Sequence, residues 1–203
     1  MSAKNGSNST GENTLGHLWN ETIGLPSRII YRFHQGVFAL SAMMDDFDWQ
    51  FVNSYLNVAE MALFKQLPEY EQKHAVETAK KMLLLGHGRI DLEERKLARI
   101  GLLHDVGKAA IRLSVLDKSY MVVLKKFLPW AYWGFATLGK KEKSWRPFRK
   151  IYVHRMHEKI GARLLARAGA ESDVIAAIAS HGEKFHKDDL VYARLLKEAD
   201  GQY

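Results

Sequence analysis

Apolar residues three and four positions apart recur along this chain from Leu18 onward, and this helical spacing constrains its fold more than any other feature. Patterns that alternate apolar and polar residues, as strands do, are nearly absent. The chain is therefore predicted to be all-α. The expected helical segments are one stripe through Phe47, Phe51, Tyr55, Val58 and Ala62 with Asp45, Asp46 and Asp48 as caps, a helix from Pro68 to Gly86, one that begins after Asp91 and runs to Leu103, and helices over 157–168, 172–181 and 188–200.

The 203 residues are enough for one domain with a small extension. Residues 1–16 are mostly Ser, Asn, Gly and Thr, and they are predicted to form a disordered tail. They do not resemble the apolar core of a secretion signal, so a cytoplasmic location is expected. Residues 17–66 are expected to add N-terminal helices that pack on the main domain, which spans residues 67–203.

Positive charge is concentrated in one part of the chain. Residues 118–155 hold ten Lys or Arg and a single acidic residue, which gives this block +9 while the whole chain carries +7. The same block holds Trp130, Trp133 and Trp145, three of the five tryptophans. We interpret about 113–150 as a basic, aromatic insertion. It could be a solvated lid over the site or a contact with an anionic membrane surface, and nucleic acid is not expected as a partner.

The stretch from Met121 to Leu138 is largely apolar but is not expected to span a membrane. Lys125, Lys126 and Pro129 interrupt it, and charged residues inside a bilayer are costly. An interfacial hairpin at the membrane surface is therefore the form that a lipid contact would take. The tryptophans of the block could also stack on a nucleotide base, although packing within the insertion explains their spacing as well.

Several helices place a polar side chain where their spacing calls for an apolar one. Any one of these residues could be a core histidine bonded to a carbonyl or a capping aspartate. Together they have one common explanation, because imidazoles and carboxylates that converge can hold one or two divalent cations. With no cysteine in the chain, the ligands must be nitrogen and oxygen, which suits Fe, Mn, Co or Zn. The residues concerned are His74, His104, His157, His181 and Asp200.

The adjacent pair His104 and Asp105 strengthens this interpretation. Neighbours on a helix diverge by about 100°, so both could reach one ion only near a helix end, which Gly107 supplies. Lys108 follows on the same side, three residues after Asp105. It could hold a phosphate oxygen beside the metal, or it could form an ordinary salt bridge to Asp105.

The run from Gly101 to Lys108, Gly-Leu-Leu-His-Asp-Val-Gly-Lys, resembles the signature of the HD superfamily of metal-dependent phosphohydrolases in its HDIG form. Other segments follow in the order found in that family, over about residues 68–203. His74 matches an upstream helical histidine, the six residues from His157 are similar to an HPEIGA segment, the residues around His181 are similar to an HHE segment, and Asp200 matches the closing aspartate.

This resemblance implies an all-α helical bundle with a metal centre. One ion would be held by His74, His104, Asp105 and Asp200, and in the two-metal branch of the family Asp105 would bridge to a second ion held by His157 and His181. Lys108 would contact the substrate phosphate. The resemblance also implies hydrolysis of a phosphoester by metal-activated water.

Two departures from the family pattern matter for the second metal site. Gly182 replaces the second histidine of HHE, and Glu158 replaces the proline of HPEIGA. The Gly-Tyr-Pro signature of the HD-GYP phosphodiesterases is missing as well, which disfavours cyclic di-GMP. These departures leave open a second function, a non-catalytic regulatory module that binds a nucleotide or a protein.

The predicted catalytic residues are Asp105, Lys108 and a proton donor for the leaving oxygen, for which His154 and Glu183 are both candidates. The metal ligands interact only with phosphate, so they do not identify the rest of the substrate. A nucleotide or cyclic dinucleotide is our choice. The sequence does not indicate an oligomeric state.

Overall fold

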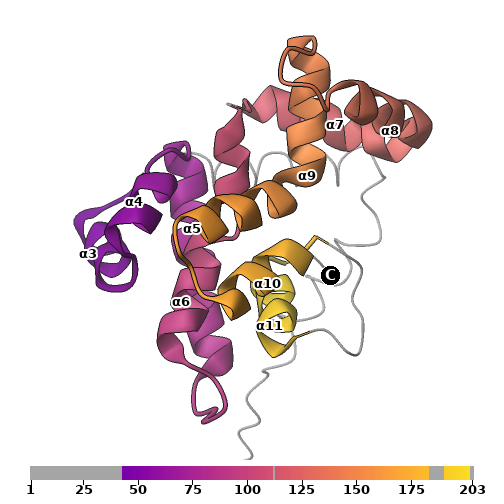
Figure 1. The fold of residues 1–203 in the computed structure, drawn as a ribbon. Coiled ribbons are helices and arrows are strands. Elements are labelled where there is room, and N and C mark those ends of the chain that lie inside the picture. The colour runs from indigo at the N-terminus through magenta and orange to yellow at the C-terminus, as the bar shows by residue number, and fades with distance from the viewer. Residues whose placement is uncertain (1–42, 112, 183–189, 202–203) are drawn as a thin grey trace, which may run out of the picture. The chain divides into compact units, whose positions relative to one another are not determined.

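The structure is a computed structural model that describes residues 43–111, 113–182 and 190–201 (Figure 1). The predicted tail and the candidate proton donor Glu183 lie outside these residues. Within them every regular element is a helix, so the all-α prediction is confirmed. The elements are α3 (Asp46–Tyr55), α4 (Val58–Phe64), α5 (Glu69–Gly86), α6 (Glu94–Leu103), the 3-10 helix η1 (Val106–Ala110), α7 (Val115–Phe127), α8 (Pro129–Leu138), α9 (Arg146–Arg167), α10 (Ser172–Ser180) and α11 (Val191–Ala199).

The main core lies between α5, α6, α10 and α11. Its fully buried residues come from each of these helices and include Val76, Ile100, Ile178 and Leu196. Helices α5 and α6 lie close together at Gly101, where a Cβ atom would lie 2.7 Å from the amide nitrogen of Ala79. A side chain at that position would therefore force the two helices apart.

Helices α3 and α4 are separate, which corrects the prediction of one stripe from Phe47 to Ala62. The side chain of Asn57 accepts a hydrogen bond from the backbone of Glu60 at 2.9 Å and starts a new helix there, in a capping box. Phe47 and Val58 consequently point into solvent, and Val52 and Phe64 supply the buried contacts. The apolar spacing was consistent with one helix, but the local cap divided it.

Helix α6 begins at Glu94, three residues after Asp91, as expected, and Asp91 pairs with Arg89 at 2.7 Å. The predicted start of the helix over 157–168 was wrong. Helix α9 begins at Arg146, well before the predicted residue 157, with Pro147 in its first turn, where the missing amide hydrogen costs nothing.

A second, smaller core is formed by α7, α8 and the first half of α9. Met121, Leu124, Tyr132, Ala136 and Ile151 are buried there, and this cluster is distinct from the main core. Figure 1 shows α7 and α8 grouped beside one end of α9. The basic aromatic block thus has a hydrophobic core of its own, while the predicted limits of the domain and the insertion stay predictions.

Candidate metal centre

Six predicted metal ligands come from five helical elements and meet in one place. His74 lies on α5 and His157 on α9, and the other four stand where helices end. His104 is the C-terminal cap of α6 and Asp105 follows it, while His181 caps α10 and Asp200 caps α11. Their ligand atoms form two groups, each with all its atoms within 4.8 Å of one another. The groups are His74, His104 and Asp200, and Asp105, His157 and His181.

The first group is centred on Asp200. His74 Nε2 donates a hydrogen bond to Asp200 Oδ1 at 2.8 Å, and His104 Nε2 lies 3.5 Å from the same oxygen. The rings of His74 and His104 meet edge to face, with their centroids 5.3 Å apart. Two imidazoles and a carboxylate from α5, α6 and α11 thus share a single small volume.

The second group adjoins the first through Asp105. Oδ1 of this carboxylate lies 3.2 Å from His157 Nε2, and Oδ2 lies 3.2 Å from His104 Nε2. The ring of His181 contacts both histidines, with its centroid 5.5 Å from that of His104 and 5.7 Å from that of His157. Asp105 therefore presents one oxygen to each group, as a bridging ligand would.

Three of the histidines are oriented in the same way. Nδ1 donates to the carbonyl oxygen three residues earlier in each case, at 2.8 Å from His104 to Gly101, 2.8 Å from His157 to His154 and 2.9 Å from His181 to Ile178. A carbonyl only accepts hydrogen bonds, so Nδ1 must carry a hydrogen in each ring. This hydrogen bond directs Nε2 to the centre of the site, the arrangement that is usual for metal-binding histidines.

Two of the inward nitrogens have no hydrogen bond. Nε2 of His104 and Nε2 of His181 are fully buried, and neither has a hydrogen bond of good geometry, although carboxylate oxygens lie 3.2 and 3.5 Å from Nε2 of His104. A buried polar atom without a partner costs about 1 to 3 kcal/mol. A divalent cation would accept the lone pair of a neutral imidazole at that position. The donor set of nitrogen and oxygen atoms, with its orphaned nitrogens, therefore fits a divalent metal ion.

The charges of the cluster lead to the same conclusion. Burial would lower the pKa of His104, but the carboxylates of Asp105 and Asp200 raise it to about 10. Burial raises the pKa of each of these carboxyl groups, yet the neighbouring imidazoles hold it well below its usual range. Burial and the charge of His104 lower the pKa of His181 to about 4, so that ring is neutral near pH 7. The two carboxylates thus stabilise positive charge between them, and a cation would supply it.

Gly107 allows α9 to approach the segment that carries Asp105. A Cβ atom on Gly107 would overlap the carbonyl oxygen of His157 and would lie 2.6 Å from the amide nitrogen of Gly161. The helix was expected to end at this glycine, but α6 already ends at Leu103, and Gly107 lies within the 3-10 helix η1, whose backbone lies against α9. This contact places Asp105 within reach of His157.

Lys108 pairs with the predicted bridging carboxylate. Its ammonium group donates to Asp105 Oδ2 and lies 3.5 Å from Glu71 Oε2. The salt bridge that the sequence offered as an alternative is therefore present. Sequence reasoning missed Glu71, although it precedes His74 by one helical turn on α5, and this position was the available signal.

A cleft of about 430 Å³ opens beside the second group. His154, His157, Glu158 and Gly182 line it, and so do residues of the basic aromatic block, among them Lys125, Tyr132, Trp133 and Arg155. His154 Nδ1 is 2.9 Å from the hydroxyl of Tyr132, a contact that the sequence did not indicate. The guanidinium group of Arg155 stacks over Trp133 at 3.7 Å from the ring centroid. Trp130 and Trp145 do not line this cleft.

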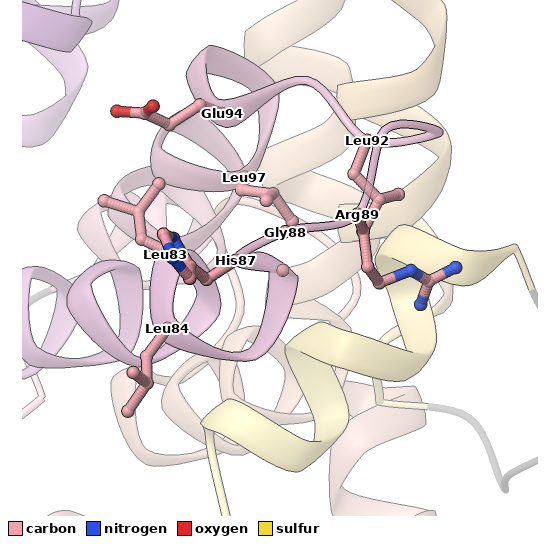
Figure 2. Close-up of a pocket in the computed structure, with 9 residues that line it drawn as sticks. Leu83, Leu84, His87, Gly88, Arg89, Leu92, Glu94 and Leu97 are labelled. Atoms are coloured by element: carbon pink, nitrogen blue, oxygen red, sulfur yellow. The ribbon is translucent and has the colours of Figure 1, made fainter.

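A separate pocket of about 500 Å³ lies at the turn between α5 and α6 (Figure 2). Its walls include Leu84, His87, Arg89 and Leu97, and none of the six predicted ligands takes part. The six predicted ligands lie beside the cleft of about 430 Å³ and not at this pocket. That cleft is therefore the candidate site.

Comparison with known proteins identifies one family. A family model described as HD domain matches residues 72–201, a span that includes all six predicted ligands. No curated protein matches the chain, and no solved structure does.

Proposed function

The chain belongs to the HD domain family, and we propose that it is a metal-dependent phosphohydrolase that cleaves a phosphoester of a nucleotide or cyclic dinucleotide. The observation that carries the proposal is the position of Asp105 between two groups of imidazoles, with two buried Nε2 atoms that have no hydrogen bond. A chain that used these residues only for stability would leave costly polar atoms unsatisfied in its core.

His74, His104, Asp105 and Asp200 would hold one divalent ion, and Asp105, His157 and His181 would hold a second. When bound, these ions supply Lewis acidity, which activates water near neutral pH and stabilises charge on a phosphoryl group. The protein contributes fixed orientation, because the three carbonyl hydrogen bonds lock the imidazoles before any ion arrives.

Lys108 would supply positive charge to the substrate phosphate. Its ammonium group is at the edge of the cluster, between Asp105 and Glu71, and its side chain is partly exposed to solvent. These two acidic partners orient the lysine side chain. A phosphate that enters beside Asp105 would meet this charge without a rearrangement of the backbone.

His154 is our choice of proton donor for the leaving oxygen. It lines the cleft one helical turn before His157, and it contacts the hydroxyl of Tyr132, whose pKa burial raises to about 12. This phenol therefore stays protonated near neutral pH, so it orients the imidazole without a charge of its own. Glu183, outside the described residues, is the other candidate.

Trp133 favours a nucleotide as the substrate. Of the three tryptophans of the basic aromatic block, it is the one that lines the cleft beside the second group. One face of its ring is covered by Arg155, and a base could stack on the aromatic surface next to it.

The test is metal analysis of the purified full chain, followed by a phosphate-release screen over nucleotides and cyclic dinucleotides with Mn²⁺ or Fe²⁺. His104→Ala and Asp105→Ala should each lose bound metal and turnover together while the far-UV circular dichroism stays helical. His87→Ala is the matched control, because His87 is exposed at the pocket of Figure 2, and this variant should keep both bound metal and turnover. Full turnover in either cluster variant would overturn the proposal.

The second candidate is a regulatory module without catalysis. Glu158 and Gly182 favour it, because both depart from the family pattern and both line the cleft. This function predicts weak metal occupancy and nucleotide binding without phosphate release, so the same screen separates the two.

A further inference from the structure

We propose that the surface formed by α7 and α8 docks on an anionic lipid bilayer. This inference is independent of the proposed function, since it concerns the outer face of the basic aromatic block. Of the sixteen large apolar residues that are exposed in the described part of the chain, ten lie between Leu116 and Trp145. Monomeric soluble proteins rarely gather exposed apolar residues in this way unless the patch contacts something.

On α7 the exposed apolar residues form a continuous stripe. Leu116, Tyr120, Val123 and Phe127 follow one another at helical spacing, and each is more than half exposed. A neighbouring face of the helix, about 100° round from the stripe, carries Met121 and Leu124, which are buried in the second core. This helix therefore has two apolar faces: one is buried in the second core, and the other is exposed to solvent.

The exposed apolar residues continue through the turn between α7 and α8 and into α8. Leu128 and Trp130 are exposed at the turn, Trp130 to 75%. Helix α8 contains no charged residue. A helix that is apolar all round is normally buried, yet part of this one is exposed. Its buried side, including Tyr132 and Ala136, faces the second core. The inner side of α7 and α8 thus packs against α9 in the second core. Their outer side has no protein partner among the described residues.

Charge decides which occupant fits. The block around this surface carries +9, with Lys125 and Lys126 next to Phe127, and Lys140, Lys141 and Lys143 after α8, all of them exposed. A second copy would oppose the same positive charge. Residues 1–42 of the chain itself carry +1 and offer no complementary charge. Nucleic acid would match the charge but not the aliphatic stripe, since nucleic-acid interfaces are polar.

An anionic bilayer matches both properties. Apolar and aromatic side chains enter the interface, tryptophan prefers the headgroup level, and flanking lysines contact anionic headgroups. The surface would lie on the membrane and not cross it: within the described ranges, no helix is long and apolar enough to span a bilayer. Trp133 and Lys125 also line the cleft, so docking would bring the candidate site close to the membrane surface.

The test is flotation of the full chain with vesicles of phosphatidylcholine alone or mixed with phosphatidylglycerol, at low and high salt. We expect binding only to the mixed vesicles and loss of most of it at high salt. Phe127→Ser with Trp130→Ser should weaken binding by at least about tenfold. Lys125→Gln with Lys126→Gln should weaken it by about fivefold for each lysine. Two double variants at exposed residues elsewhere are the matched controls, and both should bind as the unchanged chain does. The control for the apolar change is Leu84→Ser with Ile90→Ser, and the control for the charge change is Arg163→Gln with Arg167→Gln.

A second measurement does not depend on a disruptive variant. Lipids with brominated tails should quench part of the tryptophan fluorescence of the bound chain, and Trp130→Phe should remove much of that quenching while binding persists. Failure to bind mixed vesicles at low salt would overturn the proposal. Two other results would also overturn it. One is an oligomer of the unchanged chain, seen by sedimentation velocity, that dissociates when Phe127 and Trp130 are replaced. The other is preferential binding of an oligonucleotide at the same salt concentration.

Discussion

The carboxylate of Glu158 occupies the space beside Gly182. A Cβ atom on Gly182 would overlap Glu158 Oε1 and would lie 2.6 Å from Cδ and 3.1 Å from Cγ. Glu158 and Gly182, which both depart from the expected HD segments and both line the cleft, are therefore in contact.

This contact predicts an energetic coupling between the two residues. Gly182→Ala should destabilise the unchanged chain by about 1 kcal/mol, because Glu158 must move, and should have almost no effect in a Glu158→Ala background. Urea unfolding of the two single variants and the double variant measures the coupling. Strictly additive effects would show that Glu158 does not occupy this space in solution.

The position of Asp105 predicts how metal content divides between the groups. His74→Ala removes a ligand from the first group and His157→Ala from the second, so each should lower the metal content from about two ions per chain to about one. Asp105→Asn should lower both occupancies, because its oxygens face both groups. Elemental analysis after purification in excess Mn²⁺ gives the ratios. Equal loss of all metal in every variant would indicate a single site.

A buried ion pair outside the metal centre is expected to stabilise the fold. Arg99 donates to Glu60 at 2.6 Å, both side chains are buried, and Arg99 also pairs with Glu171. Glu60→Gln should lower the free energy of unfolding by about 3 kcal/mol, because it leaves a buried guanidinium group with less compensation. The exposed Glu77, which pairs with Lys73 and Lys80, is the control, and Glu77→Gln should cost less than about 1 kcal/mol.

Acid should weaken the attachment of α3 through Asp48. Burial raises the pKa of this carboxyl group, but hydrogen bonds from Lys73 at 2.6 Å and Lys80 at 2.9 Å outweigh it, so the pKa lies below its usual value of 3.8. A lowered folded-state pKa stabilises the protein above the unfolded value and loses that effect as the pH falls through the folded value.

The stability difference between the unchanged chain and Asp48→Asn should therefore be constant above about pH 5 and should shrink below pH 3.8. Urea midpoints across this range measure it. Asp46→Asn removes the same charge from an exposed position on the same helix and should show a much smaller dependence. A pH-independent difference for Asp48→Asn would contradict the assigned role of the two lysines.

The sequence was sufficient to predict the helical class, because the apolar spacing survives tertiary packing. The resemblance to the HD segments indicated which six predicted ligands would lie together. The sequence was not sufficient to predict helix ends, which depend on local caps. The Asn57 capping box divided a stripe that is continuous by spacing alone. The sequence was also not sufficient to predict side-chain contacts between helices that are far apart in the chain. Neither the hydrogen bond between Tyr132 and His154 nor the contact of Glu158 with Gly182 has a signal in the order of residues.

Gly107 provides the sharpest test of how the site is assembled. A methyl group at this position would overlap the carbonyl oxygen of His157, and backbone atoms of α9 are less able to move aside than a flexible side chain. Gly107→Ala should therefore separate η1 from α9, carry Asp105 away from His157, and lower metal retention at the second group more than at the first. We expect a loss of about 1 to 3 kcal/mol in unfolding free energy.

Gly134→Ala is the matched control, because a Cβ atom there meets nothing within 4 Å and alanine is the better helix former. It should leave stability unchanged or raise it by up to about 1 kcal/mol. The combination of Gly107→Ala with His157→Ala should retain no less metal than His157→Ala alone, since both changes act on the same group. Further loss in the double variant would mean that Gly107 supports the first group as well, and that the contact between η1 and α9 positions the whole centre.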